Sequence, residues 1–508
     1  MQSYHIYNRL TGFGVFLTAT IVYTLTLEPS SSFWDCPEFI TSAARLEVGH
    51  PPGAPLFMLL GNLFSHLASD PSKIAWWINW MNALFSAACV TFLFWTITAL
   101  LRKLLTPRQY EDRIQTATIL TGGLIGALIY LFSDTFWYSA VEGEVYSCSS
   151  FFTALTFWSV LKWETYAPAP SADRWLIFIA LLIGLSIGVH LLNLLCIPAI
   201  GLVIYYRLSS RPNGKGVSGV LILSALIVAL VLFGLLPGMM RLAGKFELMA
   251  VNGLGLPYHT GTCLHFLLLL MLLTLCIILS LGSRRRLPAA AAALSGLLLT
   301  GMTLRESAAT SWTITLTASV LLGYLLHRGW HRAPATTWRI LHTSACALLM
   351  LVIGYSTYAV ILIRASDNPP MNQQAPDNPF ALQSYLGREQ YGEKPLLYGQ
   401  TYISPLALKQ EGNTLRYETK EGAPIYRRAQ PADGHSRPHY VEIGRKTDYV
   451  YEPETCVWFP RMHDARYAAE YRWWAGEPTG RTISRYDPQT GSRQNVTIPS
   501  AGQHLRFL

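Results

Sequence analysis

Residues 74–95 read IAWWINWMNALFSAACVTFLFW and contain no charged side chain. A helix needs about 20 consecutive, mostly apolar residues to cross the hydrocarbon core of a bilayer, and it satisfies its backbone hydrogen bonds internally. Tryptophan is enriched where such a helix meets the membrane interface. The stretch therefore predicts a membrane-spanning helix over residues 74–101 with aromatic residues at one interface.

Ten further apolar segments lie on either side of this helix. With 51% hydrophobic and 14% charged residues among 508, the chain is too apolar for a soluble protein of this length. The first segment lacks the basic start and cleavage site of a signal peptide, so we expect a retained helix. The sequence predicts a mainly α, polytopic membrane core of about 11 transmembrane helices, at residues 7–27, 74–101, 116–133, 145–163, 174–189, 190–206, 217–240, 262–282, 287–304, 309–327 and 338–363.

The basic residues predict the orientation of the core. If the N-terminus is cytoplasmic, sixteen Lys and Arg residues fall on the cytoplasmic side of the segments and six on the other side. This distribution satisfies the positive-inside rule. The net charge of +9 is explained by this topology, so we expect no nucleic-acid partner.

The composition changes after the last apolar segment. We expect residues 1–364 to form the membrane domain, including an outer loop over 28–73, and the Pro- and Asn-rich residues 365–379 to form a linker. Residues 380–508 predict a small mixed α/β domain on the extracytoplasmic side, with a helix at 464–474. No closing element follows, so we expect this domain to be incomplete and the chain to be truncated.

Carboxylates gather on the outer side of the predicted membrane domain. Ten of its fourteen acidic residues fall there, and eight of these lie in the loop over 28–73 or around residues 133–147. Acidic side chains near a bilayer are costly and often functional. The eight cysteines form no C-x-x-C pair, which excludes a zinc site or a disulfide framework of the usual spacing. The sequence thus directs the search for function to outer carboxylates.

The first outer loop contains FWDCPEFITSAARLEVGHPPGAPLF, residues 33–57. Helical spacing puts four polar residues on one face and an apolar stripe, expected to face the membrane, on the other. His50 and a Pro-Pro-Gly turn then lead to a second interfacial helix at Pro55–Ala68, and the two helices predict a polar pocket. The alternative is a capping box in which the first two carboxylates serve only the helix end. The polar face is Asp35, Glu38, Ser42 and Arg45, and the stripe is Phe39, Ala43 and Leu46.

Other polar residues at outer helix ends are candidates, each with a structural alternative. For Glu142 and Glu144 in VEGEVY, one interpretation is that they line a site, and the alternative is that they form a solvated turn. His190 in SIGVHLLN is a ligand or a hydrogen-bonded core histidine. Arg364 holds a lipid phosphate or anchors its helix by snorkelling. The segment KFELMAVNGLGLPYHTG offers substrate binding or only loop chemistry through Glu247, Asn252 and Tyr258.

Five motifs occur in order along the chain: FWDCPEFITSAARLEVGHPPGAPLF (33–57), FSDTFWYSAVEGEVYS (132–147), ELMAVNGLGLPYHTG (247–261), GYSTYAVILIRASDNPP (354–370) and REQYGEKPLLYGQTY (388–402). Together they resemble the bacterial members of the transmembrane protein 260-type protein O-mannosyltransferase family. The chain is more loosely similar to the GT-C class of glycosyltransferases, and the first likeness runs nearly end to end. The resemblance implies a multi-helix membrane core, an active site on the extracytoplasmic side, an acidic residue in the first outer loop and a polyprenyl-phosphate-linked sugar donor.

The resemblance implies transfer of a mannose-like sugar to Ser or Thr of exported proteins at a bacterial inner membrane. Such a transfer needs a carboxylate to accept the hydroxyl proton and donors for the departing phosphate. We assign Asp35 as general base and Glu38 as its positioning or proton-sharing partner. No cofactor is required, although clustered carboxylates suit a divalent metal. The residues predicted to bind substrate are His50, Arg45, Glu142, Glu144, His190, Glu247, Asn252, Tyr258 and Arg364.

Two other classes of function fit a polytopic chain. A transporter or lipid-sugar flippase would carry polar residues at mid-depth of its helices, whereas most polar groups here lie at helix ends. A scaffold would use residues 380–508 to bind envelope proteins and would not need Asp35. Glycosyltransferase is the function that the outer carboxylates favour.

Overall fold

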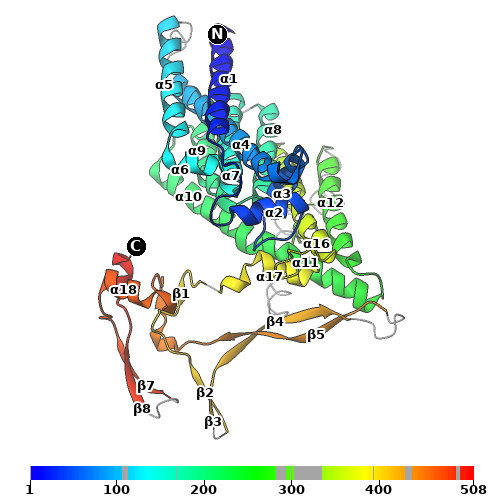
Figure 1. Cartoon of the computed structure of the whole chain (residues 1–508), viewed down its shortest axis with the longest axis vertical. Helices are drawn as coiled ribbons and strands as arrows, with labels where there is room; N and C mark the ends of the chain where they lie inside the picture. Colours follow the sequence, from blue (N-terminus) through cyan, green and yellow to red (C-terminus); the bar gives the residue numbers. More distant parts are fainter. Residues whose placement is uncertain are drawn as a thin grey trace. The chain divides into compact units, whose positions relative to one another are not determined.

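The computed structural model divides into two compact units, residues 1–387 and 388–508, each described by itself below (Figure 1). The first unit extends past the predicted boundary at residue 380, because residues 365–387 pack within it. The structure describes residues 2–105, 112–167, 169–281, 293, 295–298, 300–301, 335–392, 394–412, 414–429, 437–487 and 492–507.

The first unit is built from helices. Its described α-helices are α1 (Gln2–Leu25), α2 (Cys36–Arg45), α3 (Pro55–Ser65), α4 (Ile74–Lys103), α5 (Arg113–Leu131), α6 (Asp134–Ala140), α7 (Val145–Tyr166), α8 (Asp173–Ile187), α9 (Cys196–Leu208), α10 (Gly214–Ala229), α11 (Leu236–Leu248), α12 (Thr260–Ser280), α15 (Ala335–Tyr355), α16 (Ala359–Ser366) and α17 (Pro379–Leu386).

Seven helices in the described residues are long and apolar enough to cross a membrane, which confirms the mainly α, polytopic fold. Helices α1 and α7 coincide with two more predicted segments but carry more polar residues. The segments predicted at 287–304 and 309–327 lie largely or wholly outside the described residues, so the total of eleven stays a prediction. The seven helices span 71–103, 113–131, 170–187, 191–208, 214–253, 260–280 and 336–366.

The helix at 214–253 is longer than the predicted segment at 217–240. It continues through α10, a π-helical stretch at Leu230–Leu235, α11 and a second π-helical stretch at Met249–Gly253. Pro237 lies in the first turn of α11, where the wider π-helical turn before it accommodates the missing N–H group. Residues predicted as a loop after this span are therefore helical.

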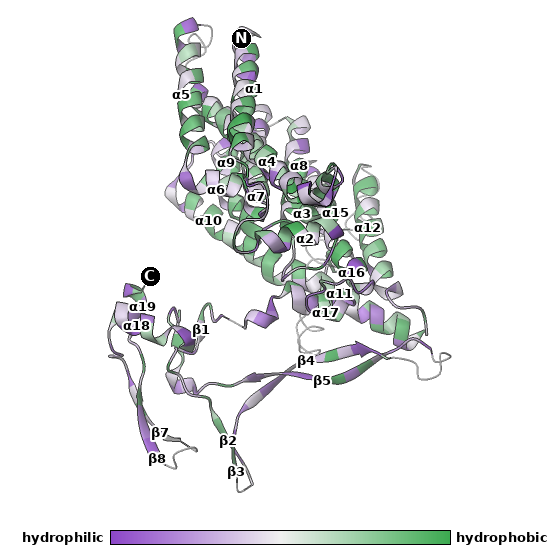
Figure 2. Cartoon of the chain, in the orientation of Figure 1, coloured by the Kyte–Doolittle hydropathy of each residue, from purple (hydrophilic) through white to green (hydrophobic). Residues whose placement is uncertain are grey.

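The outer surfaces of these helices are apolar. Leu226, Leu230 and Phe233 are 61%, 51% and 64% exposed along one helical run, and Leu267 and Met271 are exposed on α12. Figure 2 shows hydrophobic residues along the same helices. Contiguous apolar surface of this extent is unusual on a water-soluble protein but matches the hydrocarbon of a bilayer.

Helices α8 and α15 approach each other through two glycines. A Cβ atom added at Gly184 would lie 2.4 Å from the carbonyl oxygen of Leu351, and one added at Gly354 would lie 2.4 Å from the amide nitrogen of Leu185. Small residues allow such close backbone approach between membrane helices. This contact fixes the C-terminal end of α15, where Tyr355 lies, just before the 3-10 turn that contains Tyr358.

The second unit is a small mixed α/β domain, as predicted. Its described strands form four antiparallel pairs, and a helix forms at the predicted place, after a 3-10 turn at Ala465–Tyr467. Tyr402, Met462 and Tyr471 form a small core. The pairs are β1 (Tyr398–Gly399) with β6 (Val457–Trp458), β2 (Leu408–Glu411) with β3 (Thr414–Tyr417), β4 (Thr419–Arg428) with β5 (Tyr440–Tyr449), and β7 (Thr482–Asp487) with β8 (Ser492–Thr497); the helices are α18 (Ala468–Ala475) and α19 (Ala501–Arg506).

We predict that Gly354→Ala destabilises the first unit. Its new methyl group would overlap the backbone of α8, so the helices must separate, at a cost of about 1–3 kcal/mol. Gly219→Ala on α10 is the control, because a Cβ atom there meets no atom within 4 Å. Thermal unfolding in detergent measures both variants. Equal melting temperatures would contradict the close packing of α8 against α15.

Candidate functional site

The two predicted interfacial helices are present as α2 and α3. Asp35 and Glu38 both lie beside His50, and a polar pocket there stays a prediction. The predicted apolar stripe faces the protein and not the membrane. Phe39 and Ala43 are 7% and 0% exposed, within a core cluster that includes Ile78 of α4 and Phe152 of α7. The stripe faces the protein because α4 and α7 lie beneath α2. Ser42, predicted on the polar face, is buried as well.

The carboxylate of Glu38 fixes the segment between α2 and α3. Its Oε1 atom accepts the His50 backbone N–H at 2.5 Å, lies 3.0 Å from His50 Nδ1 and accepts Gln373 Nε2–H at 3.2 Å. Gly49 makes this approach possible, since a Cβ atom there would lie 2.7 Å from Oε1. These hydrogen bonds, above all that from the His50 side chain, hold the pKa of Glu38 below its ordinary value. Glu38 is therefore ionised at neutral pH.

Asp35 does not serve as a helix cap. It occupies the residue before α2, yet its side chain accepts no capping hydrogen bond. Glu38 bonds to His50 and not to the N–H of Asp35, so the alternative of a capping box is wrong. The Asp35 side chain is 59% exposed, and its Oδ2 lies 3.9 Å from His50 Nε2. The structure thus presents an accessible carboxylate next to one ring nitrogen and a fixed carboxylate at the other.

Part of the predicted linker packs against the segment between α2 and α3. Val48 N–H donates to Met371 O at 2.9 Å, and Gln373 N–H donates to Val48 O at 3.0 Å, forming a short parallel bridge. This bridge places the Gln373 amide on Glu38. No sequence pattern indicated a role for Gln373, because its surroundings are rich in Pro and Asn and typical of a flexible connection.

Other side chains hold the ends of this segment. Arg364 donates from Nε to Leu46 O at 2.7 Å, where α2 ends in a left-handed residue with φ 49°, and from Nη1 to Asp367 at 3.0 Å. Tyr385 of α17, also missed by the sequence analysis, donates to Gly49 O at 2.6 Å. Arg364 thus lies at the site, and its binding of a phosphate stays a prediction.

Arg45 and Glu47 form a looser pair at the end of α2. Their side chains approach to 3.9 Å, with Arg45 70% exposed and Glu47 almost fully buried. An exposed cation at this distance contributes little to stability. Arg45 is the last residue of α2, and its role in binding substrate stays a prediction.

The second acidic motif lies against α2. Asn82 of α4 donates to the carbonyl oxygens of Glu142 and Glu144 at 2.6 and 2.7 Å. A Cβ atom added at Gly143 would lie 2.8 Å from Ile40, so the glycine permits this packing. Glu142 and Glu144 are 8% and 7% exposed. The alternative of a solvated turn is therefore wrong.

A neighbouring asparagine orders the start of the outer loop. Asn79, one helical turn before Asn82 on α4, donates to Glu28 O at 2.7 Å and Ser30 O at 2.8 Å. Ser32, which follows in the loop, donates its hydroxyl to Glu142. Two asparagines of one helix thus hold the two acidic loops side by side. Neither asparagine was predicted to have a role.

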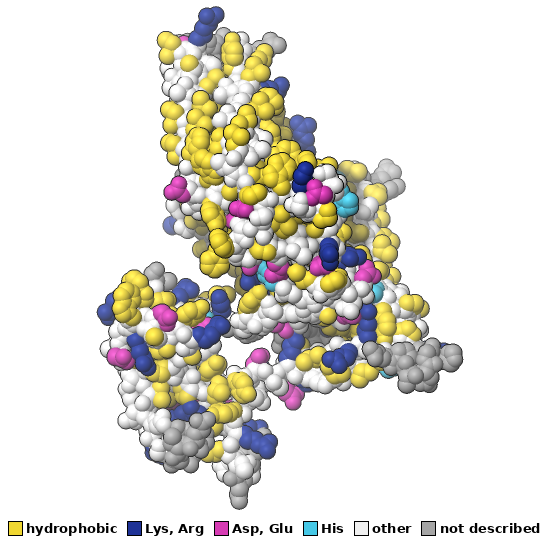
Figure 3. Space-filling model, in the orientation of Figure 1, with side chains coloured by type: hydrophobic (Ala, Val, Ile, Leu, Met, Phe, Trp, Pro, Cys, Tyr) yellow, Lys and Arg dark blue, Asp and Glu magenta, His cyan; other side chains and the backbone are white. Residues whose placement is uncertain are grey.

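The carboxylates form one electrostatic cluster. Burial raises the pKa of Glu144 to about 7, helped by the negative charges of Asp35 and Glu142 and opposed by the Val145 N–H bond and by His50. Burial also raises the pKa of Glu142. Figure 3 shows acidic side chains beside histidine on the face of the first unit drawn there. Asp35 is exposed to water, whereas Glu144 is a buried acid that titrates near neutrality.

Four other predicted residues occupy different positions. His190 precedes a 3-10 turn and accepts Leu192 N–H at 3.2 Å. Its ring centroid lies 5.6 Å from that of Tyr146, two residues after Glu144, with the two rings tilted by 57°. Glu247 is fully buried and accepts the N–H groups of His259 at 2.5 Å and Thr262 at 2.9 Å, which fixes the start of α12.

Asn252 and Tyr258 lie on the same corner between α11 and α12 as Glu247, Asn252 being exposed and Tyr258 half-buried. Their binding of substrate stays a prediction. No group of three His, Cys, Asp or Glu residues in the part of the chain that the structure describes is arranged to hold a metal ion. All eight cysteines are free thiols.

Comparisons with known proteins show which parts of the chain are similar to known families. Residues 35–213 match the protein O-mannosyl-transferase TMEM260 N-terminal domain, and residues 392–508 match a family of unknown function (DUF8416). The chain is 31% identical to protein O-mannosyl-transferase tmem260 of Dictyostelium discoideum over 142 residues, 28% of this chain and 15% of that protein. It is 31% identical to protein O-mannosyl-transferase TMEM260 of Mus musculus over 179 residues, 35% of this chain and 22% of that protein.

The chain thus aligns with less than a quarter of the length of either relative. No solved structure matches it. The motifs predicted at 247–261, 354–370 and 388–402 lie outside the residues matched to the TMEM260 domain, so the family likeness covers less of the chain than expected. Residues 35–213 of the chain are therefore similar to the TMEM260 N-terminal domain, and this range contains Asp35, Glu38, His50, Glu142 and Glu144.

Proposed function

We propose that the first unit transfers a mannose-like sugar from a polyprenyl-phosphate carrier to Ser or Thr hydroxyls of exported proteins. The relatives' names, protein O-mannosyl-transferase, support the class of reaction. The observation that carries the proposal is the exposed Asp35 carboxylate beside His50, whose ring is held by ionised Glu38.

In the proposed reaction, the acceptor hydroxyl oxygen bonds to the anomeric carbon as the bond from that carbon to the phosphate oxygen breaks. Asp35 accepts the hydroxyl proton, and the carrier leaves as polyprenyl phosphate, which needs little protonation. Glu38 is unsuited as the base because hydrogen bonds hold its Oε1 as an acceptor. It acts as a positioning residue.

Glu38 also determines the tautomer of His50. An ionised carboxylate only accepts hydrogen bonds, so His50 Nδ1 carries a proton and Nε2 faces Asp35. When His50 is doubly protonated, Nε2–H donates to the donor phosphate. Arg364, held at the end of α2, adds a second positive charge for the same phosphate.

The orientation of the membrane unit is part of the proposal. The excess of basic residues on one side supports a cytoplasmic N-terminus, with α2, α3 and residues 388–508 on the extracytoplasmic side of a bacterial inner membrane. The described carboxylates do not require a metal for the reaction, although they remain suited to a divalent ion.

We predict that Asp35→Asn folds normally and loses sugar transfer by about 100-fold or more, because general base catalysis contributes about 10²- to 10⁴-fold. The assay uses detergent-solubilised protein, mannosyl polyprenyl phosphate and a Ser/Thr peptide. Asp70→Asn is the control, since Asp70 is an exposed cap elsewhere in the same outer loop.

Wild-type activity in Asp35→Asn would remove Asp35 from the reaction. A protein that consumes no donor in detergent, where no compartments exist, and moves lipid-linked sugar only across vesicles would instead be a transporter or flippase.

We predict that Gln373→Glu narrows the pH range of activity. A second carboxylate in place of the amide raises the pKa of Glu38. As the pH is lowered, Glu38 therefore gains a proton at a higher pH than in the wild type. Activity is lost at that higher pH as well. The pH profile of kcat/KM measures this shift of its acidic limb. Gln374→Glu, at the adjacent position, tests for a general charge effect. Identical acidic limbs for wild type and Gln373→Glu would show that Glu38 is not coupled to Gln373.

The pKa of Glu144 predicts a pH dependence of stability. Burial raises it from 4.5 to about 7, so between these values the unfolded chain has lost a proton that the folded protein keeps. Stability therefore falls as pH rises through this window, by up to about 3 kcal/mol. Glu144→Gln removes this loss, and melting temperatures at pH 5 and pH 8 measure it. Asp134→Asn, at the exposed start of α6, is the control; a parallel response of wild type and Glu144→Gln would refute the assignment.

A further inference from the structure

Two aromatic side chains next to the candidate base are exposed. Phe33 and Trp34, which directly precede Asp35, are 76% and 89% exposed, and no large apolar side chain that the structure describes is more exposed than Trp34. Polar residues flank the pair, since Ser32 precedes it and Asp35 follows it. Exposed apolar patches with a polar rim mark surfaces that bind a partner. The reaction proposed above uses neither ring.

The backbone of Trp34 adopts an unfavourable conformation. Its φ angle is 61°, in the left-handed region that bulky residues rarely adopt. The chain is fixed on both sides of it, because Ser32 donates its hydroxyl to Glu142 and Cys36 is fully buried in the core beneath α2. Strained conformations of this kind persist where the surrounding structure determines them, and they cluster at functional sites. The fold thus displays the Trp34 ring at a cost in stability.

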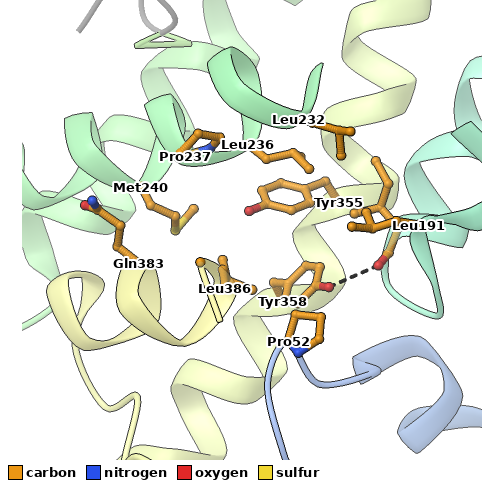
Figure 4. A pocket seen from close by; sticks show the side chains of 12 residues that line it. Pro52, Leu191, Leu232, Leu236, Pro237, Met240, Tyr355, Tyr358, Gln383 and Leu386 are labelled. Atoms are coloured by element: carbon orange, nitrogen blue, oxygen red, sulfur yellow. Dashed lines mark hydrogen bonds between the residues drawn. The ribbon is translucent and has the colours of Figure 1, made fainter. Parts of the chain in front are cut away.

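Protein lies on one side of Asp35. His50 Nε2 is 3.9 Å from the Asp35 carboxylate, and Pro52, two residues after His50, lines an apolar cavity together with Tyr358 (Figure 4). The proposed donor phosphate lies on this His50 side. A second substrate therefore approaches Asp35 from the side of Trp34.

The surface around the aromatic pair argues against its insertion into the bilayer. The exposed residues of α2 are Pro37, Thr41 and Arg45, whereas its apolar residues face the protein core. A helix that lies in the membrane interface instead turns an apolar face outward. Insertion of the pair would also carry the exposed Asp35 carboxylate toward hydrocarbon, where a charge is costly. The two rings are therefore better suited to a polypeptide than to lipid.

We propose that Phe33 and Trp34 bind apolar side chains of the acceptor polypeptide within two positions of its Ser or Thr, and so determine which hydroxyls receive the sugar. The inference rests on the proposed function and names its specificity-determining residues. The Cα atoms of Trp34 and Asp35 are about 3.8 Å apart, and an extended acceptor advances about 3.3 Å per residue. An acceptor hydroxyl at Asp35 therefore puts the neighbouring acceptor side chains beside the two rings. Aromatic side chains bind them at a low cost in conformational entropy, because they have only two rotatable bonds.

Steady-state kinetics of the full chain in detergent test this preference with two peptides. One peptide has valine, and the other has glycine, at the two positions on each side of a single serine. We expect Trp34→Ala to raise KM for the valine peptide about tenfold, because truncating an aromatic residue at the centre of a binding surface costs this factor or more. The kcat value, the KM for the donor and the KM for the glycine peptide should stay unchanged. Trp34→Phe should keep most of the preference, and Phe233→Ala, 64% exposed on the helix at 214–253, is the control that should change none of these values.

Trp34→Gly separates binding from folding. Glycine adopts a positive φ angle readily, so this variant should melt at or above the temperature of the wild type and still raise KM for the valine peptide as Trp34→Ala does. A lower melting temperature with a lower kcat for both peptides would show that the ring only supports the fold. A raised KM for the donor alone would place the ring at the sugar, and effects seen only in vesicles would make it a bilayer anchor. Each of these three results would overturn the proposal.

Binding without transfer distinguishes this inference from the proposed function. Fluorescence anisotropy of the labelled valine peptide, measured without donor, should show about tenfold weaker binding to Trp34→Ala than to the wild type. If the wild type binds the peptide in this way but transfers no sugar, the proposed function is refuted and the binding surface stands. Sugar transfer with equal KM values for the valine peptide in the wild type, Trp34→Ala and Trp34→Gly would refute the binding surface and leave the function standing.

Discussion

The site depends on one hydrogen-bonded carboxylate. Glu38 binds both the backbone and the ring of His50, and this joins α2 to the turn that leads into α3. Because the low pKa of Glu38 keeps it charged at neutral pH, the contact persists under ordinary conditions. The position of the His50 ring, and with it the pairing with Asp35, follows from this contact.

Apolar periodicity and polar residues next to a span were sufficient to predict α2, α3 and the cluster of Asp35, Glu38 and His50. These are local features, separated by a few residues or one turn. Periodicity also showed that Phe39 and Ala43 share a face, but not what that face contacts. Hydrocarbon and protein core are equally apolar, so only the positions of α4 and α7 distinguish lipid from protein.

Long-range hydrogen bonds were beyond the reach of these patterns. Gln373 lies more than 300 residues from Glu38 and has no periodic neighbours, and it meets Glu38 only because Val48 pairs with Asn372. In the sequence, Asn82 resembles any polar residue in a membrane helix. Only the structure shows that it donates to the backbone carbonyl oxygens of Glu142 and Glu144. Such contacts are set by tertiary packing, which a single sequence does not encode in local spacing.

The raised pKa values of the buried acids bear on how the proposed phosphate donor would approach four neighbouring carboxyl groups. With Asp35, Glu38, Glu142 and Glu144 all ionised, an incoming donor phosphate would meet four negative charges. Burial opposes ionisation of Glu142 and Glu144, whereas Asp35 remains exposed and Glu38 is held by its donors. In many active sites, neighbouring carboxyl groups have different pKa values because their environments differ. One group is then ionised and accepts a proton, while the other stays neutral. We infer that partial protonation of the buried pair reduces the repulsion of the phosphate, while Asp35 stays free to accept the proton of the acceptor hydroxyl.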